Sequence, residues 1–132
     1  MKKFSNTIML VLLIAAVYLF YTEMSPLKVD AVTLADTYSK NKTEADNNFL
    51  NKELEVTGTV KALYKLPETR SVLELNTGES KYSLFCFFVS EIDENKAAKL
   101  GNGDTVKVVG KCRGIEKYNF VEGVKIEVKK IK

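Results

Sequence analysis

The sequence predicts a mainly β domain in which a leading helix precedes a five-stranded barrel, with a short helix between the third and fourth strands. From Glu53 onward, apolar residues recur at every second position in several runs, which is the period of half-buried strands. Gly-, Asn- and Pro-containing turns separate these runs. With 132 residues, 45% of them apolar, the chain has room for one small folded domain.

The N-terminus carries an uncharged apolar run, residues 8–20, behind Lys2 and Lys3. Residues 4–22 are free of charge, and their length is close to the ~20 residues that a helix needs to cross a bilayer. We therefore expect a transmembrane signal anchor over 1–22, a linker over 23–29 and the domain over 30–132. The alternative is a cleaved signal peptide and a secreted domain. By the positive-inside rule the domain is extracytoplasmic, on the outer side of the cytoplasmic membrane.

The first element of the domain is helical. Asp30 can cap a helix, and Leu34, Tyr38 and Phe49 recur near one face at helical spacing. A capping-box pattern after Asn41 allows a break there. We expect one helix or a broken pair over 31–50.

Five strands follow, with a helix between the third and the fourth. We expect the strands at 53–66, 71–76, 81–89, 105–112 and 118–131. Ser90 can cap the intervening helix, 91–100, whose first turn carries acidic residues. Gly58, in the middle of the long first strand, is typical of a bulge or a sharp coil. This order of elements is that of the OB-fold barrel.

Residues 30–131 resemble the tRNA-anticodon-like OB-fold family of small secreted or membrane-tethered bacterial proteins. The shared pieces are Asn41, Ala45 and Asp46; Leu54-x-Val56-Thr57-Gly58-x-Val60; Cys86-x-Phe88; Leu100-x-x-Gly103-Asp104-x-Val106; and Gly110-Lys111-Cys112-x-Gly114. Members often carry a further Cys in the last strand, which this chain lacks over 124–128. The resemblance implies an OB-fold and no enzymatic activity.

The composition excludes several classes of function. The chain has no His, so catalytic triads that use His, His-ligated zinc and imidazole acid–base chemistry are excluded. No P-loop, GxSxG motif or metal-ligand cluster is present in the sequence, so we expect no enzyme, no cofactor and no metal. Without Lys2 and Lys3, the chain carries 18 basic and 17 acidic residues, a balance that argues against strong phosphate binding.

Two cysteines and two aromatic residues leave alternatives open. Strand alternation points Cys86 and Cys112 into the barrel, where they form either a disulfide or two buried thiols. The same alternation points Phe85 and Phe87 outward. These rings form a stacking surface, or the leading helix packs over them, and we favour the helix because its apolar face needs a partner.

The candidate ligand edge consists of two loops, because OB-folds bind through the loop between strands 1 and 2 and the loop between strands 4 and 5. These loops fall at 66–70 and 113–117 and carry both Arg residues of the chain. The candidate binding residues are Tyr64, Arg70, Arg113, Lys117 and Tyr118. The alternative is that both Arg side chains are simply solvated. We expect a membrane-anchored binding module for an extracytoplasmic protein or oligosaccharide, the alternative being a single-stranded nucleic-acid binder.

Overall fold

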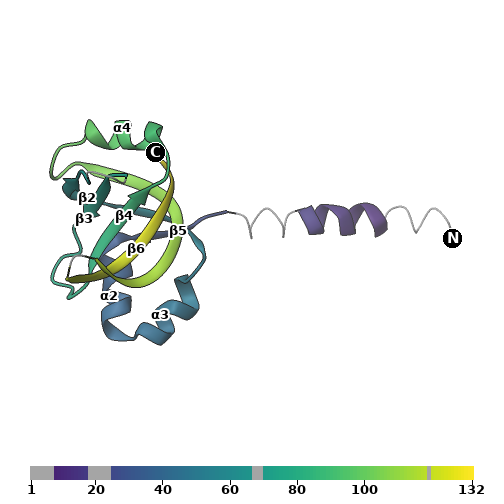
Figure 1. Ribbon diagram of the computed structural model, residues 1–132. Helices are drawn as coiled ribbons and strands as arrows, with labels where there is room; N and C mark the ends of the chain where they lie inside the picture. The colour runs from purple at the N-terminus through teal and green to yellow at the C-terminus, as the bar shows by residue number, and fades with distance from the viewer. Residues whose placement is uncertain (1–7, 18–24, 67–69, 119) are drawn as a thin grey trace.

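The computed structural model describes residues 8–17, 25–66, 70–118 and 120–132. Within these residues the domain is a strongly bent β sheet with helices at two of its ends (Figure 1). The strands are β1 (Leu27–Asp30), β2 (Glu53–Tyr64), β3 (Val72–Leu75), β4 (Ser83–Phe88), β5 (Thr105–Tyr118) and β6 (Val121–Ile131). The helices of the domain are α2 (Ala31–Lys40), α3 (Lys42–Phe49) and α4 (Glu91–Ala98).

The strand pairings follow the OB-fold order. The first half of β2 pairs antiparallel with β5, and after a register shift beyond Val60 its second half pairs with β3. From there the pairing passes through β4 to β6, in parallel, and through β6 to β5, which returns to β2. The predicted mainly β architecture is therefore confirmed. One long strand serves two neighbours because it bends in the middle, close to the predicted irregularity at Gly58.

Gly58 also allows the helices to approach the sheet. A Cβ atom at this position would lie 2.9 Å from the Cβ of Ala31, the first residue of α2. The lack of a side chain at Gly58 therefore lets the start of α2 lie directly against β2. Any larger residue would push the two elements apart.

The leading helix is a broken pair, as the sequence allows. The side chain of Asn41 accepts a hydrogen bond from the Glu44 backbone N–H at 3.1 Å and so begins α3. Asp30 stands at the start of α2, but its side chain makes no capping bond. The two helices lie across one end of the bent sheet and α4 lies at the other (Figure 1).

The apolar face of the helix pair enters the core, and the expectation that it covers Phe85 and Phe87 is wrong. Leu34, Tyr38 and Phe49 belong to the main core cluster, together with inward residues of β4, β5 and β6. Packing into this core removes the three apolar side chains from water, so the helix pair needs no other partner. The outer face of β4 is left to other residues.

One strand is absent from the prediction and another is longer than predicted. β1 occupies part of the predicted linker and pairs in parallel with β2, from Leu27 opposite Leu54 to Asp30 opposite Thr57. β5 continues past Cys112 to Tyr118. A register shift between Cys112 and Ile115 absorbs Gly114, whose φ is 78°, so this Gly marks a bulge and not a loop.

Ahead of the domain, residues 8–17 form a helix whose apolar side chains are exposed along its whole length. The helix lies away from the sheet (Figure 1). Among the residues that the structure describes, no helix is both long and apolar enough to span a membrane. The remainder of the predicted anchor, 1–7 and 18–22, lies outside the described residues.

Candidate functional site

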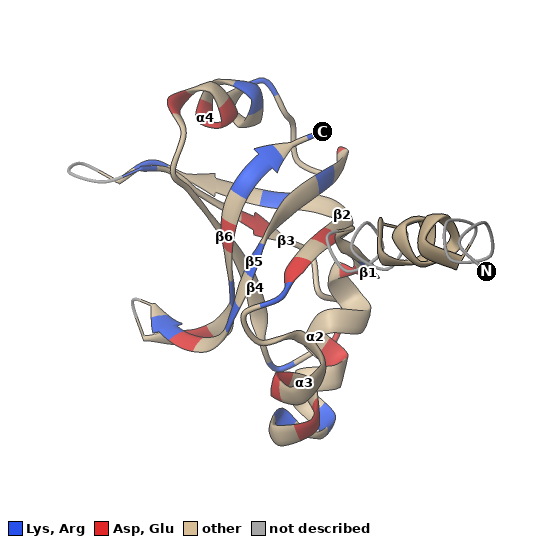
Figure 2. Ribbon diagram, turned by 90° about the vertical axis from the view of Figure 1, so that its right-hand side faces the viewer, with Lys and Arg blue, Asp and Glu red and all other residues tan. Residues whose placement is uncertain are grey.

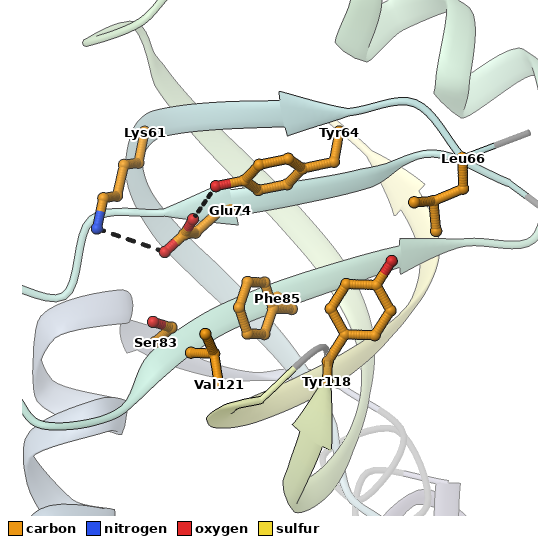
Figure 3. Close-up of a pocket in the computed structure, with 8 residues that line it drawn as sticks. All are labelled: Lys61, Tyr64, Leu66, Glu74, Ser83, Phe85, Tyr118 and Val121. Atoms are coloured by element: carbon orange, nitrogen blue, oxygen red, sulfur yellow. Dashed lines mark hydrogen bonds and ion pairs between the residues drawn. The ribbon is translucent and has the colours of Figure 1, made fainter.

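A pocket of about 370 Å³ opens on the outer face of the sheet. It lies over the second half of β2, β3 and β4, and the end of the β5–β6 hairpin borders it (Figure 3). Its lining residues are Lys61, Tyr64, Leu66, Glu74, Ser83, Phe85, Tyr118 and Val121. In the OB-fold, the face formed by the second and third barrel strands, here β3 and β4, is the one that binds ligands.

Glu74 supplies the carboxylate of this pocket. It stands opposite Phe85 in the β3–β4 pairing, and only 5% of the residue is exposed. The Tyr64 hydroxyl donates a 2.7 Å hydrogen bond to Glu74 Oε1, and Lys61 Nζ lies 3.5 Å from Oε2 (Figure 3). The hydrogen bond to Glu74 raises the pKa of the Tyr64 hydroxyl, and burial adds to the effect. Tyr64 therefore stays a donor well into alkaline solution.

Aromatic rings form the walls. The Tyr118 ring centroid lies 5.9 Å from that of Phe85 and 5.5 Å from that of Phe87. Gly123 of β6 makes room for Phe85, because a Cβ at this position would lie 2.8 Å from Phe85 Cε2. The ring of Phe85 therefore occupies the space that a side chain at position 123 would fill.

Basic residues surround the pocket, but acidic partners compensate them. Lys125 Nζ lies 4.9 Å from the Phe87 ring centroid and 3.2 Å from Glu116 Oε2. Arg70 Nη1 lies 3.3 Å from Glu94 Oε1. Figure 2 shows basic and acidic segments interspersed along β5 and β6, with no continuous basic band in this view. This distribution differs from the concentrated positive charge that phosphate backbones require.

The structure brings together some of the predicted site residues. Tyr64 and Tyr118 line the same pocket. Arg70 lines an adjoining hollow that also contains Leu66, Phe87 and Tyr118. Lys117 is exposed and stands opposite Glu122 in the hairpin.

Arg113 lies elsewhere, and the predicted loop over 113–117 is wrong because β5 runs through it. Its Nε donates to Glu127 Oε2 at 3.0 Å and its Nη1 to Asn51 Oδ1 at 3.1 Å. The chain reverses between Tyr118 and Val121 instead. Of the other predicted loop, residues 67–69 lie outside the described residues.

Sequence reasoning missed Glu74 and left Phe85 undecided. The available signal for Glu74 was a single acidic residue inside the short apolar strand Val-Leu-Glu-Leu. A carboxylate in a strand that is buried along its whole length must find donors nearby, and here Tyr64 and Lys61 supply them.

Both cysteines are free, buried thiols, and the strand register explains why they do not meet. Cys86 and Cys112 both stand opposite Ile126, one on each side of β6. Two strand spacings of about 4.8 Å separate their backbones by roughly 10 Å, which exceeds the ~7 Å limit for a disulfide. The disulfide alternative therefore does not fit this register.

Comparison with solved structures finds the same fold in proteins of low sequence identity. A lipoprotein from Klebsiella pneumoniae, described as a proposed nucleic acid-binding protein, aligns with a TM-score of 0.57 and 14% identity over 80% of this chain and 92% of that chain. The asparaginyl-tRNA synthetases of Entamoeba histolytica and Pyrococcus horikoshii align with TM-scores of 0.52 and 0.50 and identities of 12% and 21%. These alignments cover 82% and 64% of this chain but only 23% and 20% of the synthetases.

A search of curated proteins finds no match to this sequence. The sequence model of the tRNA_anti-like family matches residues 17–122, which include the leading helices, β2 to β5 and the pocket. The match and the shared fold agree with the motifs in the sequence. The chain belongs to the tRNA_anti-like family.

Proposed function

We propose that this chain is a non-enzymatic OB-fold binding module, held at the cell envelope by its N-terminal apolar segment. Its ligand is an extracytoplasmic saccharide or peptide that enters the pocket on the outer face of β3 and β4. The observation that carries the proposal is the pocket itself. It combines aromatic walls with one nearly buried carboxylate, Glu74, on the face that OB-folds use for binding.

The pocket favours a ligand that donates hydrogen bonds and presents an apolar or flat surface. Glu74 accepts hydrogen bonds, and Phe85 and Tyr118 offer ring surface. A phosphate group would meet Glu74 as a like charge, while the nearby cations Lys125 and Arg70 already have acidic partners.

The N-terminal helix supports a location in the envelope. Its apolar residues, from Ile8 to Val17, are exposed, and contiguous apolar surface of this kind marks contact with a membrane or another protein. The fold neighbour from Klebsiella pneumoniae is described as a lipoprotein. A lipoprotein is anchored to a membrane by its lipid, and here the apolar segment would take that role.

Single-stranded nucleic acid is the second candidate ligand. The rings of Phe87 and Tyr118 meet at the edge of the pocket, and aromatic side chains on an OB-fold surface stack on bases. The same Klebsiella neighbour is described as a proposed nucleic acid-binding protein. Binding of this kind weakens steeply with salt because many phosphate contacts are involved, whereas binding of an uncharged saccharide does not.

The experiment is a titration of the full-length chain, in detergent, with three probes at two salt concentrations: an oligosaccharide of N-acetylglucosamine or glucosamine, a lysine-containing peptide and a single-stranded oligonucleotide. We expect saccharide or peptide binding that Tyr118→Ala weakens and that Ile92→Ala, an exposed change on α4, leaves intact. Salt-sensitive binding of the oligonucleotide alone would favour the second candidate. Cell fractionation with external protease tests the location, and a domain protected inside the cell would contradict it.

A further inference from the structure

We propose that the ligand of the outer-face pocket carries an ammonium group, which binds Glu74 in place of Lys61 and lies against the aromatic walls. The inference rests on the proposed function, because it names the chemistry of the ligand in that same pocket. Its basis is the arrangement of Glu74, Tyr64 and Lys61 (Figure 3).

Glu74 has unused capacity to accept hydrogen bonds. Only 7% of its side chain is exposed, so solvent supplies few donors. Oε1 already accepts from Tyr64 at 2.7 Å, whereas Lys61 Nζ lies 3.5 Å from Oε2. A charge-assisted hydrogen bond between nitrogen and a carboxylate is typically about 2.7–2.9 Å long. Oε2 therefore has room for a closer donor.

Lys61 shows that the pocket accommodates an ammonium group. Its side chain is 58% exposed, long and flexible, and it reaches the carboxylate from the edge of the pocket. An ion pair with one exposed partner contributes little to stability, so exchanging Lys61 for another cation costs little. The lysine acts as an internal competitor for the position that the ligand takes.

The aromatic walls suit a cation as well. Tyr64 lies beside the carboxylate, Phe85 stands opposite Glu74 in the β3–β4 pairing, and Tyr118 lies beyond Phe85 (Figure 3). The faces of aromatic rings attract ammonium groups. On the same face of the sheet, Lys125 Nζ already lies 4.9 Å from the Phe87 ring centroid. Rings and carboxylate together favour a cation over a neutral group, and they disfavour an anion.

An ammonium group of this kind comes from an amino sugar or from a lysine side chain. The chemistry that the pocket recognises is the same in both. The experiment therefore compares a glucosamine tetramer with its N-acetylated form, and a lysine-containing peptide with the same peptide acetylated at the lysine Nζ atom. We expect at least one ammonium probe to bind the full-length chain, and its acetylated form to bind roughly tenfold more weakly or not at all.

Two substitutions test the assignment with opposite signs. Glu74→Gln removes the charge but keeps an oxygen to which Tyr64 can donate, and should weaken the ammonium probe about tenfold. Lys61→Gln removes the internal competitor and should strengthen it about threefold. The matched controls are Glu53→Gln and Lys129→Gln. These two residues form an ion pair outside the pocket, with 3.6 Å between Lys129 Nζ and Glu53 Oε2, and neither substitution should change the affinity for the ammonium probe.

The outcomes separate this inference from the proposed function. If acetylated and free amine probes bind equally, or if Lys61→Gln weakens binding and Glu74→Gln strengthens it, the ammonium assignment is overturned while the binding face stands. If no probe of either kind binds, both proposals fail. Because the Lys61 change is at an exposed side chain, its result does not depend on whether Glu74→Gln folds normally.

Discussion

Phe87 of β4 and Tyr118 at the end of β5 meet edge to face, with ring centroids 5.5 Å apart and ring planes at 82°. The Tyr118 ring also lies 5.9 Å from that of Phe85. One tyrosine thus holds the β5–β6 hairpin against the outer face of β4 and forms one wall of the pocket. The packing that stabilises this hairpin and the shape of the candidate site depend on the same ring.

Tyr118→Ala should lower the free energy of unfolding by about 1–3 kcal/mol, because it removes two ring contacts and leaves Phe85 and Phe87 more exposed. Tyr118→Phe keeps the ring and should stay within about 0.5 kcal/mol of the parent protein. Urea denaturation measures both changes. Equal stability of the Ala and Phe variants would show that the ring contacts carry no weight.

Gly123→Ala should destabilise the domain by about 1–3 kcal/mol, the usual cost of an extra methyl group in a packed site. The added Cβ would lie 2.8 Å from both Phe85 Cε2 and the Ser83 carbonyl oxygen. Because the paired strand cannot easily yield, Phe85 must move into the pocket. Gly101→Ala is the control, since its Cβ would meet nothing closer than Asp104 Oδ2 at 3.6 Å. Thermal unfolding compares the two, and similar midpoints would contradict the packing argument.

Much of the fold could be predicted from local sequence patterns. Alternation marks the strands, Ser90 accepts from the Ile92 N–H at the start of α4, and Asn41 begins α3. The parts that escaped prediction depend on tertiary pairing. β1 is four residues long and exists through its parallel pairing with β2, which no local pattern encodes. Gly114 resembles a loop residue in the sequence, but it permits a bulge within a continuous strand.

The candidate site was predictable in part for the same reason. Tyr64 and Tyr118 lie next to the expected chain reversals, so the fold order alone brings them to one face. The placement of Arg113 at the site was wrong because it depended on a loop over 113–117, where the structure has β5. Glu74 could not be placed, because its role follows from which residues β2 and β4 set beside it.

Both cysteines should be unpaired thiols that the folded domain protects from alkylation. Cys86 and Cys112 are fully buried and separated by Ile126 in the strand register. We expect an alkylating reagent to modify neither in the native chain and both after denaturation without reductant, counted by intact mass. Denatured chain that takes up no reagent until a reductant is added would contradict this register.

Stability should fall in alkaline solution, with a contribution from Cys86 that a substitution can isolate. Burial raises the pKa of the Cys86 thiol from 9.0 to about 12. Well below pH 9 the thiol is protonated in both the folded and the unfolded chain, so the full contribution of this group to the free energy of unfolding is present. Between pH 9 and about 12 only the unfolded chain loses the proton, so the free energy of unfolding falls by at most about 1.4 kcal/mol per pH unit from this group.

The measurement is urea denaturation of the parent chain and Cys86→Ala from pH 7 to 10.5 in the presence of reductant. The Ala variant loses packing and should be less stable at pH 7, but its stability should fall less steeply above pH 9. The other groups that titrate in this range, namely Cys112, the lysines and the tyrosines, are the same in both chains, so the difference between the slopes belongs to Cys86. Parallel curves would mean that the thiol ionises as readily in the folded chain as in the unfolded one, which its complete burial does not allow.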